Sequence, residues 1–395
     1  MFRRMDLLLL GITVVLTFFG LAMIASVSVF ESYQITSRLV NQGIQEAPSN
    51  SFYLWRSFIH VVVALIAMGL TAVIPYRMWE RLALPLFGAT LLLLIGVFIP
   101  GINAGYGTAS SWIRIGFIPS IQPSEFLKLT LIFYLAIWLQ KREQLIGTWK
   151  EGFIPFASVL LLATILVALQ PDLGSFLVLS AIAVVMFFIA GGNIFHVVLG
   201  GGIAAIMGLP IILEKEYIRN RFRAFLRPDD PAIAETIGFQ IKQALIAVGS
   251  GGVFGVGYGK SIQKFGYLPE VQADMIFSAM AEELGFLRLL IIIGMFGILI
   301  WRGYQIGQEA PDRFGFLVAT GITTWIAVQT ILNIGVNLSL FPLTGLTLPF
   351  ISYGGSSLLS NLMAVGILLN ISSHSVYETS RARHSRRHAR KMATR

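Results

Sequence analysis

Long apolar stretches recur along almost the whole chain and constrain its fold more than any other feature. A helix needs about 20 apolar residues to cross the hydrocarbon core of a bilayer. Segments of this kind, with ends uncertain by a few residues, are 6–30, 54–75, 79–99, 123–140, 154–170, 174–191, 193–213, 275–301, 314–335 and 353–373. The sequence therefore predicts an all-α polytopic membrane protein with about ten transmembrane helices.

The overall composition supports a membrane protein. Of the 395 residues, 55% are hydrophobic and only 12% are charged, whereas soluble domains carry about 25% charged residues. The first apolar segment follows Arg3 and Arg4, as in a signal peptide, but it is long enough to span and has no clear small-x-small cleavage site. We therefore expect it to remain as the first transmembrane helix.

Basic residues in the short loops predict the orientation, because lysine and arginine are enriched in cytoplasmic loops. With ten helices, one side collects Arg3, Arg4, Arg77, Arg81, Lys141, Arg142, Lys150, Arg302, Arg313 and the C-terminal tail. Both termini are then cytoplasmic, and 214–274 forms a large extracellular loop between helices 7 and 8. We expect one membrane domain, 1–375, that includes this loop, and a basic cytoplasmic tail, 376–395.

Two clusters of positive charge suggest anionic partners. The tail from Arg381 to Arg395 is basic and has no acid, and anchoring to anionic lipid is favoured over nucleic acid. The extracellular loop is also basic, and loops of about 60 residues are largely exempt from the orientation rule. Its charges fit either an anionic substrate or attraction to lipid headgroups. They are Lys215, Arg219, Arg221, Arg223, Arg227, Lys242, Lys260 and Lys264.

Several chemistries are disfavoured. The chain has no cysteine, and its five histidines lack metal-site spacing. Gly259-Lys260-Ser261 ends like a nucleotide-binding loop, but Phe254 stands where that motif needs glycine, so no nucleotide is expected. The surrounding glycines would still let the backbone approach a bulky anion, with Lys260 and Lys264 beside it. The alternative is a flexible outer loop with snorkelling lysines.

Asp274 stands where the extracellular loop meets the eighth apolar segment. Pro269 and Glu270 resemble a helix start, so Asp274 is either a capping carboxylate or a functional one at the mouth of an apolar bundle. In a regular helix Glu282 would lie about 12 Å further along the axis, beyond the roughly 5–9.5 Å of paired glycosidase carboxyls. Glu283 would lie on the opposite face. The two glutamates are expected to pair with bases, so Asp274 would act with a cation or metal.

Two further segments carry polar groups into apolar surroundings. Glu125 and Lys128 share one helix face at i,i+3, as either a structural pair or part of a ligand cavity. The segment 342–357 contains prolines, glycines and hydroxyls, including Ser356 and Ser357. Broken backbone of this kind is tolerated at membrane depth only where it is buried in protein or lines a wet cavity.

Five stretches together resemble one known family. They are QPSEFLKL (122–129), QPDLGS (170–175), AVGSGGVFGVGYGKSIQKFGYLPE (247–270), D-x-I-F with AEELG (274–285) and PLTGLTLPFISYGGSS (342–357). On these motifs the chain resembles the SEDS family (FtsW, RodA and SpoVE) over nearly its whole length. The form S-x-Q-K-x-x-Y-L-P-E is most similar to the FtsW type.

The resemblance implies ten transmembrane helices and a peptidoglycan glycosyltransferase that polymerises lipid II on the outer face of the bacterial cytoplasmic membrane. Asp274 matches the family's essential aspartate and would be the general base on the acceptor GlcNAc 4-hydroxyl. Undecaprenyl pyrophosphate would leave, helped by basic residues and by a divalent cation (Mg or Mn), for which Asp274 is a possible ligand. Candidate substrate contacts are Lys260, Lys264, Arg219, Arg223, Glu125, Lys128, Ser356 and Ser357.

The resemblance also implies partners: the growing glycan chain, a class B penicillin-binding transpeptidase and other divisome or elongasome membrane proteins. Division, elongation and sporulation roles all remain open. Two other classes of function are a flippase for lipid II or a related precursor, and a non-catalytic division scaffold. A flippase needs polar residues at mid-depth in several helices, whereas most polar residues here are predicted on the outer side.

The chain departs from the family pattern at a few positions. Ala273 and Met275 flank Asp274 where the family usually has threonine and phenylalanine. Ser111 stands in place of an arginine, for which Arg114 is a possible substitute. Arg288 occupies a position that is normally apolar, and the sequence does not identify its partner.

Overall fold

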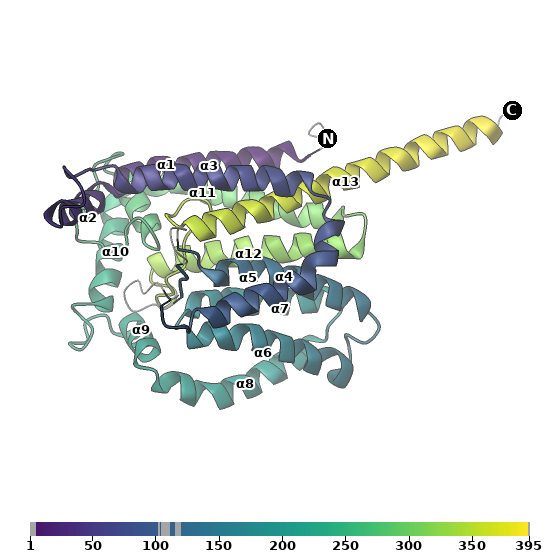
Figure 1. Cartoon of the computed structure of the whole chain (residues 1–395), viewed down its shortest axis with the longest axis horizontal. Helices are drawn as coiled ribbons and strands as arrows, with labels where there is room; N and C mark the ends of the chain where they lie inside the picture. The colour runs from purple at the N-terminus through teal and green to yellow at the C-terminus, as the bar shows by residue number, and fades with distance from the viewer. Residues whose placement is uncertain (1–4, 102, 104–110, 115–119, 394–395) are drawn as a thin grey trace.

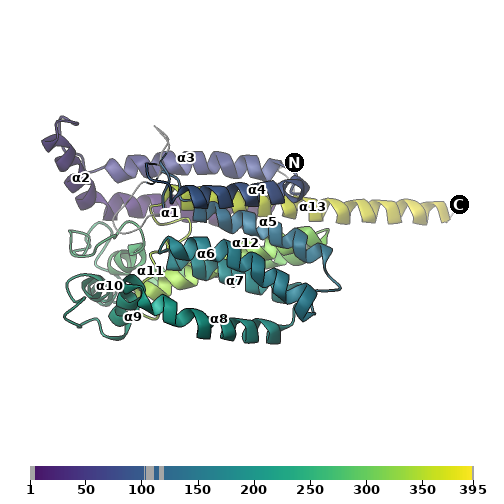
Figure 2. The same ribbon diagram turned by 60° about the horizontal axis from the view of Figure 1, so that its bottom comes forward.

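The computed structural model describes residues 5–101, 103, 111–114 and 120–393. Within these residues the fold is all-α, with thirteen α-helices and a short π-helix at Trp149–Phe153. The only β-pairings there are isolated bridges around Ile113. Most of the helices run side by side in one bundle (Figures 1 and 2). The expected all-α fold is confirmed.

Each of the ten apolar segments corresponds to a helix. These are α1 (Leu7–Val27), α3 (Phe52–Val73), α4 (Arg77–Gly96), α5 (Pro123–Lys141), α6 (Ile154–Leu169), α7 (Leu173–Ile189), α8 (Ile194–Glu214), α11 (Ile276–Gln308), α12 (Arg313–Asn337) and α13 (Gly355–Ala393). Seven helices of the described part are long and apolar enough to cross a membrane, and α5, α7 and α8 are not among them. The chain is thus a multi-pass membrane protein, while the count of ten spans stays a prediction.

The expected extracellular loop contains two helices, α9 (Glu216–Leu226) and α10 (Ile237–Gly251). They lie at the same end of the bundle as α2 (Val29–Asn41), and both chain termini lie toward the other end (Figures 1 and 2). This arrangement agrees with the expected separation of loop and termini. The second half of α13 projects beyond the bundle as a single helix (Figure 1).

Helices α12 and α13 form much of the interior. In the most apolar stretch of α12 and of α13, 78% and 83% of the residues are buried. In the corresponding stretches of α4 and α11 only 22% are buried. The buried side chains of α12 and α13 include amides such as Gln329, Asn333, Asn337 and Asn361. Buried amides need hydrogen-bonding partners. For the three amides of α12 these include Lys128 of α5, Asp274, Ser278 of α11 and the segment 338–354, and for Asn361 the partner is Ser357 of α13.

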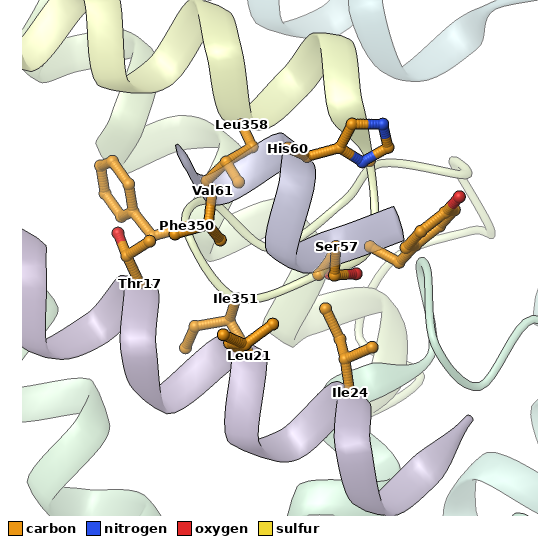
Figure 3. A pocket seen from close by; sticks show the side chains of 12 residues that line it. Thr17, Leu21, Ile24, Ser57, His60, Val61, Phe350, Ile351 and Leu358 are labelled. Atoms are coloured by element: carbon orange, nitrogen blue, oxygen red, sulfur yellow. The ribbon is translucent and has the colours of Figure 1, made fainter. Parts of the chain in front are cut away.

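The segment 338–354 between α12 and α13 has no regular structure and is packed inside the protein. Leu346, Leu348 and Ile351 are buried, and a Cβ on Gly20 of α1 would lie 2.6 Å from Ile351 Cα. The cavity left between α1, α3 and this segment is about 10 Å³ (Figure 3), roughly the space of one water. The broken backbone is therefore largely accommodated by burial in protein.

Helix α11 is interrupted at Gly285, which has φ +75°. At this point α11 and the loop that follows α10 exchange four backbone hydrogen bonds. The donor–acceptor pairs are Val256 to Glu282 (2.9 Å), Gly257 to Glu283 (3.0 Å), Phe286 to Gly252 (3.0 Å) and Leu287 to Val253 (3.2 Å). The loop thus satisfies the backbone groups that the interruption frees, as apolar surroundings require.

Candidate active site

Asp274 lies just before α11, in a turn rather than inside a helix. The helix start expected at Pro269 and Glu270 is wrong: α11 begins at Ile276, and Glu270 has φ +52°. A turn with positive φ replaces the regular first turn, so the acids there do not act as ordinary helix-start residues.

Two asparagines of α12 hold the backbone around Asp274. The carbonyl of Asp274 accepts hydrogen bonds from Asn333 Nδ2 (2.9 Å) and Asn337 Nδ2 (2.8 Å). Asn337 Oδ1 also accepts from the backbone amide and the hydroxyl of Ser278, at 3.0 and 2.7 Å. These bonds fix where the Asp274 side chain leaves the main chain.

Asp274 is 8% exposed as a residue, and its Oδ1 is buried without a hydrogen-bonding partner. Burial and, after it, the nearby charge of Glu270 raise the pKa of Asp274, to a net value of about 7. The positive charge of Arg221 and the backbone amides of Asp274 and Met275 oppose this rise. The result is a carboxylate whose pKa suits a general base at neutral pH.

Arg221 of α9 provides the positive charge near Asp274. Its guanidinium lies 4.2 Å from the centre of the Tyr217 ring, and Nη1 donates to the carbonyl of Leu343 (2.5 Å). Burial lowers the pKa of Arg221, whereas Tyr217, Asp274 and Asp172 raise it. Arg221 therefore links α9 to the segment 338–354 by a hydrogen bond and acts on the Asp274 carboxylate through its charge.

The sequence analysis named Arg219 and Arg223, and not Arg221, as candidate substrate contacts. Arg219 is exposed, and Arg223 pairs with Asp230 at 3.5 Å. The available signal was the i,i+4 spacing of Tyr217 and Arg221, which puts both on one face of a helix. That signal depends on recognising 216–226 as helical.

The two candidate lysines have different surroundings. Lys260 is exposed. Lys264 is buried, and its Nζ contacts Gly259 O (2.7 Å), Glu283 Oε1 (3.0 Å) and Ser26 Oγ (3.2 Å). An ammonium has three protons, and these three contacts can take all of them. Lys264 is thus part of a buried ion pair, and its role as an anion ligand stays a prediction.

The glutamates of α11 also differ from each other. Glu283 pairs with Lys264, as expected for a base partner. For Glu282 that expectation is wrong: its carboxylate accepts from the Ser261 hydroxyl and from the amide of Ile262 (2.9 Å). Both glutamates tie the loop to α11, which leaves Asp274 without a second carboxylate from this helix.

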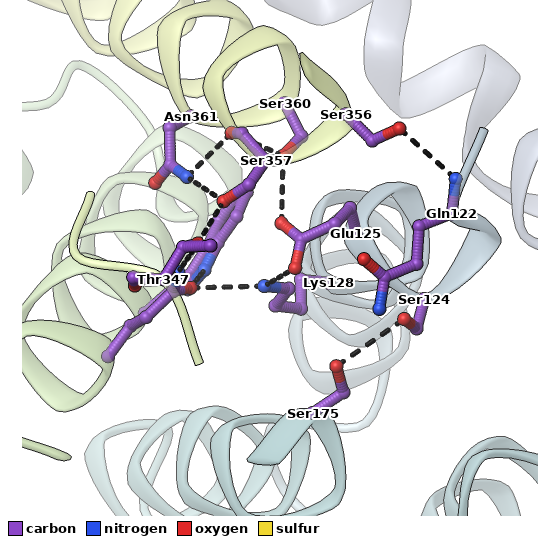
Figure 4. Close-up of polar contacts among 12 residues, drawn as sticks. Gln122, Ser124, Glu125, Lys128, Ser175, Thr347, Ser356, Ser357, Ser360 and Asn361 are labelled. Atoms are coloured by element: carbon purple, nitrogen blue, oxygen red, sulfur yellow. Dashed lines mark hydrogen bonds and ion pairs between the residues drawn. The ribbon is translucent and has the colours of Figure 1, made fainter. Parts of the chain in front are cut away.

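Glu125 and Lys128 of α5 form a buried pair in the bundle. Lys128 Nζ lies 2.7 Å from Glu125 Oε1 and 3.0 Å from Gln329 Oε1 (Figure 4), and 5.0 Å from the centre of the Trp325 ring. Ser360 donates to the other Glu125 oxygen at 3.3 Å. The expected pairing is confirmed, and a role in shaping a substrate cavity stays a prediction.

The serines of the last motif contribute to the same interior network (Figure 4). Ser356 Oγ accepts a hydrogen bond from the backbone amide of Gln122 at 3.1 Å. Ser357 Oγ lies 2.8 Å from Thr347 Oγ1 and 3.3 Å from Asn361 Nδ2. Both hydroxyls are mainly engaged with protein groups.

The motifs around residues 122 and 172 contact each other. Asp172 accepts from Gln122 Nε2 (3.3 Å) and Ser124 Oγ (3.1 Å), and it caps α7 by accepting from the Ser175 amide (2.9 Å). A Cβ on Gly174 would lie 2.5 Å from Leu346. Asp172 is therefore a helix cap that brings α5, α7 and the segment 338–354 together near Arg221.

The segment 338–354 connects the two polar clusters. Its carbonyls at Leu343 and Leu346 accept from Arg221 and Asn333, next to Asp274. Thr347 accepts from Gln329 at its carbonyl (3.0 Å), next to Lys128. A buried carboxylate, a cation and a polar interior thus lie at one end of a helical bundle.

A family model for FtsW, RodA and SpoVE, described as "Cell cycle protein", matches residues 6–377. The chain belongs to the FtsW/RodA/SpoVE family.

Two relatives within this FtsW/RodA/SpoVE family are each 41% identical to the chain. One is stage V sporulation protein E of Bacillus subtilis, over 94% of this chain and 98% of the relative. The other is a probable peptidoglycan glycosyltransferase FtsW of Trichlorobacter lovleyi, over 93% of both.

Solved structures agree with this assignment to the FtsW/RodA/SpoVE family. One comes from a study of a peptidoglycan synthase complex that coordinates polymerization and crosslinking, with TM-score 0.75, 26% identity and coverage of 94% of this chain and 98% of that one. Another is the rod shape determining protein RodA of Thermus thermophilus, with TM-score 0.65, 26% identity and coverage of 93% and 96%.

The positions that depart from the FtsW/RodA/SpoVE pattern have defined surroundings. The amide of Ala273 donates to Glu270 O at 3.0 Å, and Met275 is fully buried. Ser111 donates to the Gln170 carbonyl at 3.1 Å. Arg288 donates to Phe254 O at 2.8 Å, so it supports the loop at the interruption of α11. Arg114 is exposed and has interactions of its own.

Proposed function

We propose that this chain polymerises lipid II into glycan strands on the outer face of the bacterial cytoplasmic membrane, with Asp274 as the catalytic base. Relatives about 40% identical and named as probable peptidoglycan glycosyltransferases support the activity. The observation that carries the choice of base is the buried Asp274 carboxylate with an unpartnered Oδ1 and a pKa raised to about 7.

The proposed reaction is a displacement at the anomeric carbon of the donor sugar. Asp274 accepts the proton of the acceptor 4-hydroxyl while the hydroxyl oxygen forms the new glycosidic bond. The bond between the anomeric carbon and the pyrophosphate oxygen breaks, and its electron pair leaves with undecaprenyl pyrophosphate. A general base is effective when its pKa lies near the working pH.

The leaving group is a pyrophosphate, so cations beside the base would stabilise the charge that develops on it. Arg221 is the best placed of these, because its charge acts on Asp274. The exposed Lys260 and Arg219 are further candidates. We assign Glu125, Lys128, Ser356 and Ser357 to shaping the interior beneath this site.

A divalent cation, Mg or Mn, fits this site only in a limited way. No group of three potential side-chain ligands occurs in the part of the chain that the structure describes. Magnesium is commonly held by one or two carboxylates together with substrate phosphates. The unpartnered Oδ1 of Asp274 could be one such ligand. A cation bound there would neutralise charge on the pyrophosphate.

The proposed partners follow from the structural relatives. One of these comes from a peptidoglycan synthase complex that couples polymerization to crosslinking. We propose that this chain likewise works with a class B penicillin-binding transpeptidase, and with other division or elongation proteins of the membrane. The growing glycan strand would be its second substrate.

The activity is tested with purified chain and lipid II in detergent, with and without the cognate transpeptidase. Our proposal predicts glycan strands. The same preparation in liposomes is tested for movement of lipid II between leaflets. Transport without polymerisation would replace our proposal with a flippase, and neither activity, with or without the partner, would favour a scaffold.

A further inference from the structure

A second candidate site lies at the end of the bundle that carries the chain termini. A cavity of about 730 Å³ opens between the start of α4 and the end of α5, which lie side by side (Figures 1 and 2). Its wall includes Glu80, Arg81, Tyr134, Trp138, Lys141 and Arg142. Ligand sites commonly have volumes of about 300–1,000 Å³. Asp274 and Arg221 belong to the opposite end of the bundle.

The cavity contains positive charge that the protein does not neutralise. Three cations and one carboxylate line it. Among the ion pairs of the described residues, none includes Arg81, Lys141 or Arg142. The only hydrogen bond found for Arg142 in the described part is to the Glu151 carbonyl (3.2 Å).

Other arginines in the loops at this end do have carboxylate partners. Arg77 pairs with Asp312 at 3.2 Å, and the remaining pairs are Arg302 with Asp6 and Arg313 with Glu143. Arg77, Arg302 and Arg313 thus differ from the three cations of the cavity, which have no carboxylate partner among the ion pairs of the described residues.

The rest of the cavity wall is aromatic and apolar. The guanidinium of Arg142 lies 5.2 Å from the centre of the Trp138 ring, and the Tyr134 ring stacks on Phe87 at 4.8 Å. Leu84, which also lines the cavity, is 67% exposed. Aromatic rings beside cations and apolar surface are typical of the membrane interface.

We propose that this cavity binds the headgroup of an anionic phospholipid. The phosphate would be held by Arg81, Lys141 and Arg142, and the acyl chains would lie along Leu84 and Ile137. Basic pockets between transmembrane helices on the cytoplasmic side are suited to such headgroups. This site is separate from the proposed glycosyltransferase centre and does not depend on it.

Trp138 allows the site to be tested directly. The full chain in detergent is titrated with phosphatidylglycerol that carries brominated acyl chains, which quench nearby tryptophan. The Trp138→Phe variant identifies the contribution of this residue among the seven tryptophans. We expect saturable quenching of Trp138 by phosphatidylglycerol and little by brominated phosphatidylcholine. Equal quenching by the two lipids would overturn the proposal.

Substitutions separate this site from general attraction between charges. The triple variant Arg81→Gln, Lys141→Gln, Arg142→Gln should bind phosphatidylglycerol about a hundredfold more weakly, since each basic residue near an anionic surface contributes roughly fivefold. Lys150→Gln removes one exposed charge outside the cavity and should leave binding unchanged. If the triple variant does not fold, Lys141→Gln alone should weaken binding severalfold.

Inorganic phosphate distinguishes a lipid from a free anion. At concentrations matched to the lipid, phosphate should neither compete with phosphatidylglycerol nor protect Trp138 from quenching. Displacement of the lipid by phosphate at such concentrations would make this a free-anion site and overturn the lipid assignment. Unchanged lipid binding by a folded triple variant would also overturn it.

Discussion

At the scale of single residues, the proposed chemistry depends on one carboxylate, and two charged neighbours shift its pKa in opposite directions. Burial and Glu270 raise the pKa of Asp274 to about 7, and Arg221 lowers it. The base form therefore predominates above about pH 7, and activity should rise with pH through that value.

Substitution of the two neighbours should move this pH dependence in opposite directions. Glu270→Gln removes a negative charge and should lower the pKa of Asp274, so the acidic limb of kcat/KM moves to lower pH. Arg221→Gln should move the limb to higher pH, whatever it does to the maximal rate. Initial rates of glycan synthesis measured across the neutral range would show both shifts.

The matched control for these variants is Glu235→Gln. Glu235 is an exposed acid of the same loop. Its neutralisation should leave the acidic limb of the kcat/KM profile at the same pH. Shifts of the same sign in Glu270→Gln and Arg221→Gln would contradict the electrostatic description of Asp274.

The raised pKa also has a consequence for stability. Folded Asp274 holds its proton to higher pH than an ordinary carboxyl, so stability is fully present at low pH and is lost as pH rises through about 7. Asp274→Asn has no such loss. We expect its free energy of unfolding in detergent to exceed that of the wild type, by a margin that grows by about 1 kcal/mol between pH 6 and pH 8 and is seen as a growing difference in thermal midpoint. A constant margin would argue against a raised pKa.

At the scale of elements, the attachment of the loop between α10 and α11 to α11 holds the segment that carries Asp274. The buried pair of Lys264 and Glu283 is one such attachment. Lys264→Met leaves Glu283 buried without its cation and should destabilise the protein by about 3–5 kcal/mol. Adding Glu283→Gln should restore much of the thermal stability and the activity.

The exposed Lys260 provides the comparison for this pair. Lys260→Met should leave thermal stability unchanged and should lower activity if Lys260 contacts the pyrophosphate. A stable but inactive Lys264→Met/Glu283→Gln double variant, with Lys260→Met fully active, would show instead that Lys264 serves the substrate.

The interruption of α11 gives a second prediction at this scale. A Cβ at Gly285 would lie 2.2 Å from the Gly255 amide nitrogen, and Gly285 has a positive φ. Gly285→Ala should therefore lower the thermal midpoint substantially. Gly294→Ala, further along α11 with open space around it, should be neutral or stabilising by about 0.5–1 kcal/mol. Equal changes of the thermal midpoint in the two variants would contradict the exchange of backbone hydrogen bonds between the loop and α11.

Hydropathy was sufficient to locate the long helices because apolar length is a local property of the sequence. It placed the eighth segment at 275–301, and α11 begins at Ile276. The exchange of bonds at Gly285 could not be predicted, because it joins backbone groups about 30 residues apart and leaves no periodic pattern. Arg221 was missed for a related reason, since its hydrogen bond to Leu343 and its charge interaction with Asp274 are tertiary.

At the scale of the whole molecule, the fold separates the proposed catalytic centre from the termini. The helices α9 and α10 lie at one end and both termini lie toward the other (Figure 1). The natural chain has no cysteine, which makes single-cysteine labelling in cells a clean test of orientation. Glu235→Cys should react with an impermeant maleimide from outside, and Lys150→Cys only after permeabilisation. The reverse pattern would invert the proposed topology.

The central claim is that this membrane protein polymerises lipid II with Asp274 as its base. The most direct measurement compares glycan strands made from lipid II by the purified wild type and by Asp274→Asn, each with its partner transpeptidase and each shown to be folded by a cooperative thermal unfolding transition. We expect strands from the wild type and none from the variant. Strands of normal yield from a folded Asp274→Asn protein would contradict the claim.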